Sequence, residues 1–425
     1  MQRPFLALLA LTLLASPVAC SKKKDDAAAT KSKSTKDDEG DDDKGKGKKK
    51  KTDDKADDDE GDKPKGKATK ACKAPEGALT ADYTIPADCK LKVKSNIDIN
   101  EGATLTIEAG AKLSFEAGVR ILVEYGKIVA KGTDDAPITF TSSNSSPAAG
   151  DWEGFYFGDK ASAGNVFDHV VIEYAGKEGG MGKCAIVVYG AVNAGRIAVT
   201  NSTFRKNEHC AIYDDKEKAT FAKLEGNTFK DNGGSSLMLA PSLVGSVGTN
   251  KFGEPLHVFA GDIKTTATWP KLDVPVIVDG RLNIYGATKA AIVTLADKTT
   301  LKFAAGGGLH LGGGDGGGLV GKGTVFTTAN ATAAEGDWAG IYLEPKTTGT
   351  VLEDCVVEYG GKDAGLGKGA VVFYETSPSK LKGVSFKGCT FRHNEHGAFF
   401  SNGEKSCGAL AKDNKSEGTP ICIAE

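Results

Sequence analysis

The chain lacks the features that mark several large classes of protein. Aromatic residues make up only 7% of its 425 residues, and apolar residues at helical spacing are missing. The 54 basic and 56 acidic residues nearly cancel, so the chain has no positive footprint for nucleic acid. No CxxC motif or close Cys/His spacing marks a metal cluster. We therefore expect no nucleic-acid partner, no metal and no cofactor.

Long hydrophobic runs are also missing, apart from one at the N-terminus. The apolar run 5–14 is too short to span a membrane as a mature helix and has the form of an export signal. It leads into Ser-Pro-Val-Ala-Cys at 16–20, which resembles a bacterial lipobox, although Pro17 stands where that pattern favours leucine. The sequence predicts a lipoprotein signal peptide over 1–19 and lipidation of Cys20, with a plain secretory signal as the alternative. A lipid at Cys20 would make a membrane the first partner of the chain.

Large apolar residues are missing from the next segment altogether. Residues 20–70 consist almost entirely of Lys, Asp, Glu, Gly, Ala, Ser and Thr. Such a composition cannot bury enough surface to offset the entropy of folding. We expect a disordered tether that presents the rest of the chain on the periplasmic or cell-surface side of a membrane.

What the chain does contain is a repeat. Three motifs recur at nearly one offset: Gly-Asp-Trp at 150–152 and 336–338, Glu-Tyr-x-Gly-Lys at 173–177 and 358–362, and Phe-Arg-x-Asn-Glu-His at 204–209 and 391–396. Such regular self-similarity indicates an internal duplication. A feature kept in both copies is therefore either architecture or a doubled site.

The sequence of each copy predicts short β-strands. Runs of three to five alternating residues, such as Leu-Thr-Ile at 105–107, are broken by Gly, Asn or Asp, and the chain has 55 glycines. This pattern fits a β-solenoid or a β-sandwich, and the duplication favours the solenoid.

Several segments resemble a known family. They are Gly-Ala-Thr-Leu-Thr-Ile-Glu-Ala-Gly at 102–110, Leu-Ser-Phe at 113–115, Gly-Lys-Ile-Val-Ala-Lys-Gly-Thr at 126–133, Pro-Ile-Thr-Phe-Thr-Ser at 137–142, and the Gly-Asp-Trp that follows. Together they resemble bacterial right-handed parallel β-helix repeat proteins of the pectin-lyase-like superfamily. The resemblance implies an all-β fold with two tandem copies, 71–262 with an N-terminal cap and 263–425 with a C-terminal disulfide cap. It does not fix an activity, because this fold hosts lyases, hydrolases, adhesins and inert scaffolds.

Four cysteines test the coil register. When the copies are aligned, Cys184 and Cys210 stand opposite glycines, and Cys355 and Cys389 stand opposite Val170 and a serine. The spacing within each pair is a plausible coil length. Stacked coils lie about 4.8 Å apart, which suits the Cα separation of a disulfide. We predict the bridges Cys184–Cys210 and Cys355–Cys389 between neighbouring coils.

The other cysteines flank the solenoid. Cys72 and Cys89 precede it, and Cys407 and Cys422 follow it. A solenoid needs caps over its apolar ends, and a disulfide loop at each end would contribute about 3 kcal/mol. Without Cys20 the remaining cysteines form an even set, which indicates an oxidising compartment.

The repeated motifs supply the candidate ligand-binding residues. Asp151-Trp152 and Asp337-Trp338 could form a sugar-stacking platform beside an acid, or a tryptophan packed under a turn that the aspartate caps. We keep both readings open. Glu173 with Arg205, and Glu358 with Arg392, could each form a catalytic pair one coil apart or a structural ion pair; the latter is favoured.

A second set of candidates is the repeated Glu-His pair. Glu208-His209 and Glu395-His396 could contact a ligand or exchange protons. The asparagine before each pair is expected to be a turn residue, because Asn tolerates the left-handed conformation.

The sequence therefore predicts a cell-envelope lipoprotein that displays a non-catalytic β-helix for binding or scaffolding. Polysaccharide is the leading ligand class, because a long solenoid side suits an extended polymer. One alternative is a polysaccharide lyase or glycoside hydrolase. A second is an adhesin or protein-interaction module whose partner is another envelope protein.

Overall fold

The computed structural model describes residues 68–178, 182–190, 196–216, 220–363, 365, 367–401 and 407–424. The predicted signal peptide, Cys20 and nearly all of the predicted tether lie outside these residues. Among the helices of the described residues, none is long and apolar enough to cross a bilayer.

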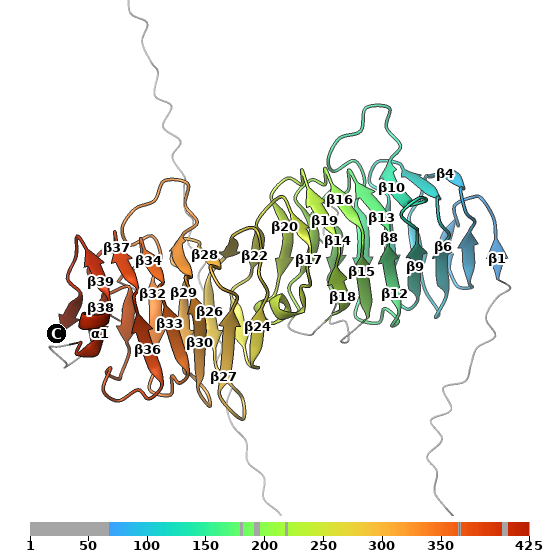
Figure 1. The fold of residues 1–425 in the computed structure, drawn as a ribbon. Helices are drawn as coiled ribbons and strands as arrows, with labels where there is room; N and C mark the ends of the chain where they lie inside the picture. The colour runs from blue at the N-terminus through green and yellow to red at the C-terminus, as the bar shows by residue number, and fades with distance from the viewer. Residues whose placement is uncertain are drawn as a thin grey trace, which may run out of the picture. The chain divides into compact units, whose positions relative to one another are not determined.

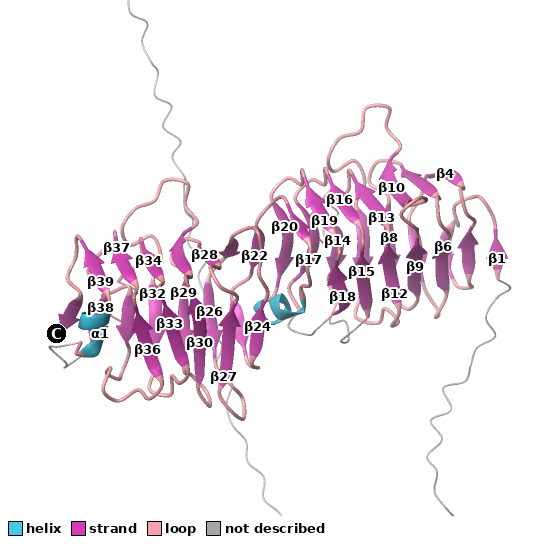
Figure 2. Cartoon of the chain, in the orientation of Figure 1, coloured by secondary structure: helices cyan, strands magenta, loops and turns pink. Residues whose placement is uncertain are grey.

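The described chain is almost entirely β-structure, as predicted. Apart from the 3-10 helix η1 (Pro241–Ser246) and the short helix α1 (Ala409–Asp413), its elements are strands (Figure 2). The strands stack coil upon coil into parallel sheets (Figure 1). The prediction of a parallel β-helix is confirmed.

Apart from the irregular coils at its two ends, each coil of the first copy contributes one strand to each of three sheets, here called A, B and C. Sheet A consists of β1 (Thr69–Lys70), β3 (Tyr83–Ile85), β6 (Thr104–Ile107), β9 (Lys127–Lys131), β12 (Asn165–Asp168), β15 (Ile197–Thr200) and β18 (Phe221–Glu225). Sheet C consists of β4 (Lys90–Val93), β7 (Lys112–Phe115), β10 (Ile138–Ser142), β13 (Val170–Glu173), β16 (Thr203–Arg205), β19 (Thr228–Lys230) and β21 (Lys251–Phe252). The solenoid thus begins at Thr69, inside the segment that we expected to be tether.

Sheet B continues from the first copy into the second. It consists of β2 (Gly77–Leu79), β5 (Ile97–Ile99), β8 (Arg120–Val123), β11 (Gly154–Phe157), β14 (Cys184–Val188), β17 (Cys210–Asp214), β20 (Ser235–Leu239), β22 (Leu256–Val258), β25 (Val276–Val278), β28 (Thr300–Phe303), β31 (Val325–Thr328), β34 (Val356–Glu358), β37 (Thr390–Arg392) and β39 (Lys415–Glu417).

Two further sheets, D and E, complete the coils of the second copy. Sheet D consists of β23 (Gly261–Ile263), β26 (Arg281–Ile284), β29 (Gly308–Leu311), β32 (Gly340–Leu343), β35 (Val371–Phe373), β38 (Phe399–Ser401) and β40 (Cys422–Ala424). Sheet E consists of β24 (Ala267–Trp269), β27 (Ala291–Leu295), β30 (Gly317–Lys322), β33 (Thr350–Glu353) and β36 (Val384–Lys387).

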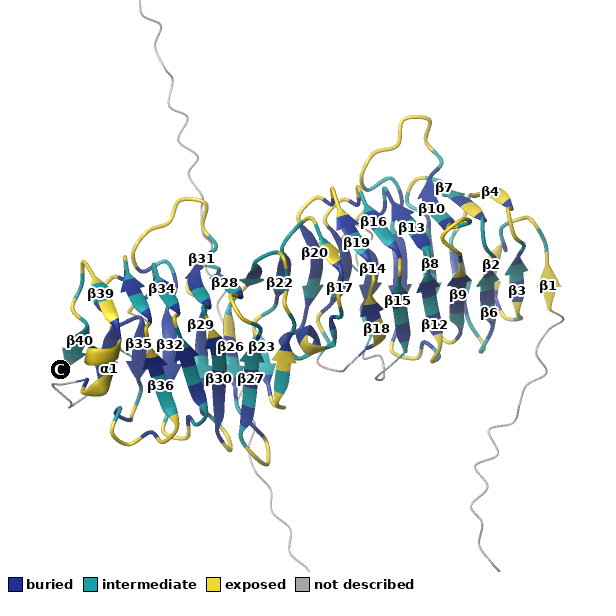
Figure 3. Cartoon of the chain, in the orientation of Figure 1, coloured by how far each residue is buried: buried dark blue, intermediate teal, exposed yellow. Residues whose placement is uncertain are grey.

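Alternation within each strand builds the core. In β6, Leu105 and Ile107 are buried, whereas Thr104 and Thr106 are partly exposed. Because successive side chains of a strand point to opposite sides, one apolar side faces inward in every coil. Burial is accordingly concentrated in the strands and exposure in the turns (Figure 3).

Buried asparagines tie the corners of successive coils together. Asn207 is fully buried; its Oδ1 accepts from the Ala175 N–H at 3.0 Å, and its Nδ2 donates to Asn232 Oδ1 at 2.9 Å. In the second copy Asn394 accepts from the Gly360 N–H at 2.9 Å. Our expectation that these asparagines supply the left-handed turn conformation is wrong. That conformation belongs to the residue before each asparagine, and the amide is needed inside to satisfy corner backbone groups.

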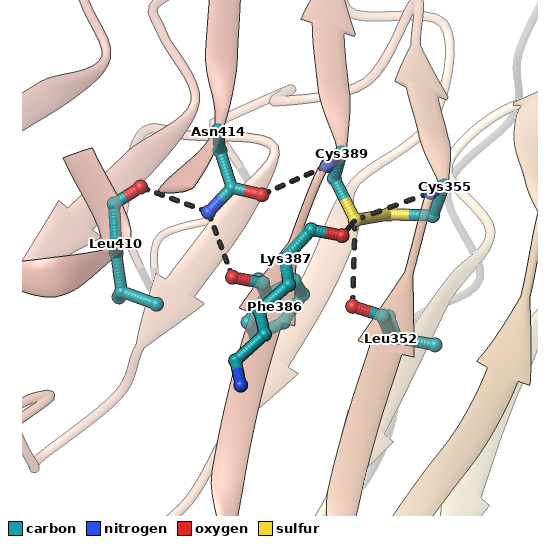
Figure 4. Close-up of a disulfide and its surroundings, with 7 residues drawn as sticks. All are labelled: Leu352, Cys355, Phe386, Lys387, Cys389, Leu410 and Asn414. Carbon is teal, nitrogen blue, oxygen red and sulfur yellow. Dashed lines mark hydrogen bonds between the residues drawn. A yellow bond between two sulfur atoms is a disulfide. The ribbon is translucent and has the colours of Figure 1, made fainter. Parts of the chain in front are cut away.

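Both predicted bridges between coils are present. Cys184–Cys210 and Cys355–Cys389 have Cα–Cα distances of 4.6 and 4.3 Å, as adjacent rungs of one stack require. The second bridge lies next to a corner asparagine: the Cys389 N–H donates to Asn414 Oδ1 at 2.9 Å (Figure 4). A disulfide here occupies corner positions of the kind that asparagines fill elsewhere.

The end caps also carry their disulfides. Cys72–Cys89 links the first coils, and Cys407–Cys422 links the segment around α1 to the last strand of sheet D. All four bridges together indicate an oxidising compartment.

Candidate functional site

The three repeated motifs meet at one corner in each copy. In the first copy the N–H groups of Gly150 and Glu208 both donate to the carbonyl of Ala175, at 3.3 and 2.9 Å. The Glu208 carboxylate packs so closely on Gly150 that a Cβ there would clash. In the second copy the Glu395 N–H donates in the same way to Gly360, at 3.0 Å. The repeated sequence is therefore the architecture of a corner.

The tryptophans of this corner belong to the core. Trp152 is fully buried, stacks on Phe115 with ring centroids 4.1 Å apart, and donates from Nε1 to the Glu173 carbonyl at 2.9 Å. Trp338 is equally buried and stacks on Phe303 at 4.3 Å. The predicted sugar-stacking role of both tryptophans is wrong, because neither ring has a free face.

The neighbouring aspartates cap the turns. Asp151 Oδ2 accepts from the Ala148 N–H at 3.0 Å, and Asp337 Oδ2 accepts from the Ala334 N–H at 3.0 Å. Burial alone would raise the pKa of Asp151, but hydrogen bonds from Ser142 and Ala148 outweigh it and lower the pKa. These are properties of a structural carboxylate.

The Glu-His pairs lie at the surface of the same corner. Glu208, His209 and Glu395 are exposed, and His396 Nε2 lies 3.7 Å from Glu395 Oε1. Ligand contact by these four residues stays a prediction.

The Glu–Arg pairs form a structural ladder. Glu173 is mostly buried; it accepts from Thr141 Oγ1 at 2.7 Å on one side and from Arg205 Nε at 2.7 Å on the other. The second copy repeats this arrangement, with Glu358 accepting from Arg392 Nε at 2.7 Å. Every oxygen is engaged within the sheet, which leaves no carboxylate oxygen poised for a substrate.

The two copies differ around a pair of tyrosines that both keep. Tyr156 on sheet B and Tyr189, which directly follows β14, correspond to Tyr342 on sheet D and Tyr374, which directly follows β35. Three charged residues of the first copy have small counterparts in the second: Arg120, Glu124 and Glu153 stand opposite Gly308, Gly312 and Ala339. Three polar residues of the second copy stand opposite small or apolar ones in the first: His310, Glu344 and Glu375 opposite Leu122, Gly158 and Gly190.

We call Arg120, Glu124, Glu153, Tyr156 and Tyr189 the first tyrosine cluster. Arg120 Nη1 lies 3.8 Å from Glu153 Oε2, and the two side chains are 26% and 14% exposed. Arg120 Nε and Glu153 Oε2 are buried atoms that have no hydrogen-bond partner among the described residues. Buried polar atoms are normally satisfied, so these two are groups that a ligand could complete.

The tyrosines of this cluster are neutral at physiological pH. Burial raises the pKa of Tyr156 to about 12, and burial together with the hydrogen bond to Glu124 raises that of Tyr189. The Tyr189 hydroxyl donates to the Glu124 carboxylate, and Tyr156 donates to the carbonyl of Gly182 at 3.4 Å. The Tyr156 ring is fully buried, whereas the Tyr189 ring is partly exposed, so Tyr189 is the aromatic ring of this cluster that a ligand could touch.

The second tyrosine cluster consists of His310, Tyr342, Glu344, Tyr374 and Glu375. The His310 ring stacks on Tyr342 at 4.6 Å, and its Nδ1 lies 3.7 Å from Glu344 Oε1. These His310 and Glu344 side chains are 12% and 30% exposed.

Electrostatics keep this histidine uncharged. Burial, helped by Arg281, lowers the pKa of His310 to about 4. Burial raises the pKa of Glu344, and a hydrogen bond to Glu375 raises the pKa of Tyr374. Both clusters hold carboxylates; the second adds a neutral imidazole, and the charge of Arg281 lies close enough to act toward lower pKa values for both His310 and Glu344.

Other kinds of site are not found in the described part of the chain. It holds no group of three His, Cys, Asp or Glu residues suited to a metal ion. A hollow of about 270 Å³ near the C-terminus is lined by Phe373, Val384, Leu410 and their neighbours, and none of the candidate residues lines it.

The sequence held a signal for the tyrosine clusters that we did not use. Of the residues that both copies keep, the Asp-Trp and Glu–Arg pairs are architecture. The informative positions are the ones where a charge in one copy faces a glycine or alanine in the other.

Comparison with known proteins agrees with the fold. Residues 77–224 match the family model described as a pectate-lyase-like beta helix domain. Neither the curated proteins nor the solved structures that were compared gave a match. The matched residues carry the stacked parallel strands of sheets A, B and C. Residues 77–224 are thus similar to pectate-lyase-like β-helix domains in sequence and in their stacked parallel strands.

Proposed function

We propose that the protein is an exported envelope lipoprotein whose β-helix binds polysaccharide without cleaving it, through the two tyrosine clusters. The observation that carries the proposal is the divergence around the tyrosine pairs. Residues needed for the coil are kept in both copies. The polar residues around the tyrosines of each copy, in contrast, have small or apolar counterparts in the other copy.

The chemistry of the clusters suits sugars. Polymer hydroxyl groups need both donors and acceptors, and the first cluster combines two tyrosines with Arg120 Nε and Glu153 Oε2, which have no hydrogen-bond partner among the described residues. Aromatic rings beside such polar groups are common in ligand sites. Among the described residues, Tyr125 is the one large hydrophobic side chain that is exposed, at 48%, which gives little support to an apolar protein-docking surface.

The binding experiment uses the full chain in gels that contain polygalacturonate, alginate, hyaluronan or the neutral glucan laminarin. We expect retardation by at least one polymer. The variant Arg120→Gly, Glu153→Ala, His310→Leu, Glu344→Gly, in which each cluster takes the other copy's residues, should lose it. Lys223→Ala on sheet A is the matched surface control. Equal retardation of the cluster variant and the wild type would contradict the proposed sites.

Cleavage is the second candidate, and one observation favours it. A mostly buried neutral histidine 3.7 Å from a carboxylate, as His310 is from Glu344, could transfer protons. The same four polymers are therefore assayed for new reducing ends and for absorbance near 235 nm. Products that disappear with His310→Leu would replace the non-catalytic proposal.

The lipid anchor at Cys20 is part of the proposal. Cells expressing the full chain and labelled with a fatty acid should yield labelled protein, and Cys20→Ala should yield none. Label that persists in Cys20→Ala would rule out this anchor.

A further inference from the structure

We propose that the protein is bivalent and bridges two separate polysaccharide chains. This inference rests on the proposed function. It follows from the placement of the two tyrosine clusters on different sheets of one solenoid.

The first step is the register of the copies. The corresponding strands β11 and β32 carry Tyr156 and Tyr342, yet β11 belongs to sheet B and β32 to sheet D. Sheet B itself continues from β11 to β31, the strand that comes just before β32 in its coil. Each strand of the second copy therefore lies one sheet further around the coil than its counterpart in the first copy.

The junction between the copies explains this shift by one sheet. Coils of the first copy pass through sheets C, B and A in turn, whereas from β22 onward they pass through B, D and E. Helix η1 follows β20, where a sheet-A strand is expected, and it contacts β18, β23 and β24. Sheet B crosses this junction unbroken through the β20–β22 pairing, while sheets A and C end there.

The second step concerns what a ligand would meet along sheet B. Beyond the first cluster, the outer row of this sheet does not repeat the tyrosine pair. The row continues through Tyr213, Met238, His257, Ile277 and Lys302. A straight polymer bound along sheet B thus leaves the second cluster empty, because that cluster faces out from sheet D.

The third step is that the clusters differ chemically. The first presents Arg120, a permanent cation, beside Glu153. The second presents His310, which is neutral at pH 7, beside Glu344. Because Arg120 and His310 each have an uncharged, non-aromatic counterpart in the other copy, we expect the clusters to bind with different affinities and each to be removable without the other.

Light scattering by mixtures of the full chain with the same four polymers tests bivalency. A bridging protein raises the scattering several-fold near equivalence, and excess protein lowers it again because each chain becomes saturated. Arg120→Gly with Glu153→Ala should abolish the rise while the variant remains retarded in the gel. His310→Leu with Glu344→Gly should do the same.

These variants also control for folding and self-association, because each introduces the residues that the other copy already holds at that position. Wild-type protein that is retarded in gels but never raises the scattering would overturn bivalency and leave the proposed function intact. So would single-cluster variants that raise it as the wild type does. Wild-type protein that no polymer retards would overturn the proposed function itself.

Discussion

Truncation of Trp152 distinguishes a core tryptophan from a binding platform. Its ring is fully buried, lies 7° from parallel to Phe115, and donates its N–H to the Glu173 carbonyl. Removal of a buried Trp or Phe side chain typically costs about 3–5 kcal/mol. The carbonyl that loses its donor adds about 1 kcal/mol. We therefore expect Trp152→Ala to destabilise the first copy by about 4–6 kcal/mol.

Two further variants separate the terms of this estimate. Trp152→Phe keeps a stacked ring and loses the N–H, so we expect a loss of about 1–2 kcal/mol. Tyr125→Ala removes an exposed ring and should change stability by less than about 0.5 kcal/mol.

The assay is urea unfolding followed by circular dichroism, with hydrogen exchange to locate the loss. A solenoid can open locally, so the change should be largest in the coils around Trp152. The reasoning is refuted if Trp152→Ala unfolds at the wild-type urea concentration but no longer binds polysaccharide. That result would mean that the ring is a platform after all.

Three further predictions concern the corners, the core and a disulfide. Asn207→Ala leaves the Ala175 N–H without its acceptor, and we expect a loss of about 2–3 kcal/mol in urea unfolding; a loss below about 0.5 kcal/mol would show that the corner does not depend on this side chain. Burial raises the pKa of Asp214 to about 7, above its unfolded value, so its contribution is fully present near pH 4 and is lost as the pH rises through 7. Asp214→Asn should therefore match the wild type at pH 4 and exceed it by about 4 kcal/mol at pH 8, and parallel pH profiles of the two proteins would contradict this assignment. Cys184→Gly with Cys210→Gly opens a link across 26 residues and should cost about 3–4 kcal/mol, whereas unchanged unfolding would mean that the bridge adds nothing.

The sequence was sufficient to predict the β-helical coils, but not to predict that corresponding strands of the two copies join different sheets. Alternation, turn residues and the spacing of Cys355 and Cys389 depend on local geometry and on the stacking distance, so they predicted the parallel β-helix and its bridges. The shift by one sheet at η1 depends on a single irregular coil. The repeated motifs are the same in both copies, so they do not show that corresponding strands join different sheets.

The site was harder to predict than the fold. For Trp152 the sequence left a surface platform and a ring packed under a turn as alternatives, and it predicted Asn207 to be a turn residue; both side chains are fully buried. Both side chains point inward because they satisfy backbone groups of a neighbouring coil: Trp152 donates to the Glu173 carbonyl, and Asn207 accepts from the Ala175 N–H. Arg120 and His310 were missed because they are not repeated. Duplication keeps what the coil requires and leaves the remaining positions free to change.

Hydroxyl-radical footprinting of the full chain, with and without the polymer that retards it, tests the central claim most directly. The account predicts protection of Tyr189 and Tyr374, the half-buried tyrosines of the two clusters, with His209 and His396 unchanged. Protection of His209 and His396 with both tyrosines unchanged would contradict it and move the binding site to the repeated corner.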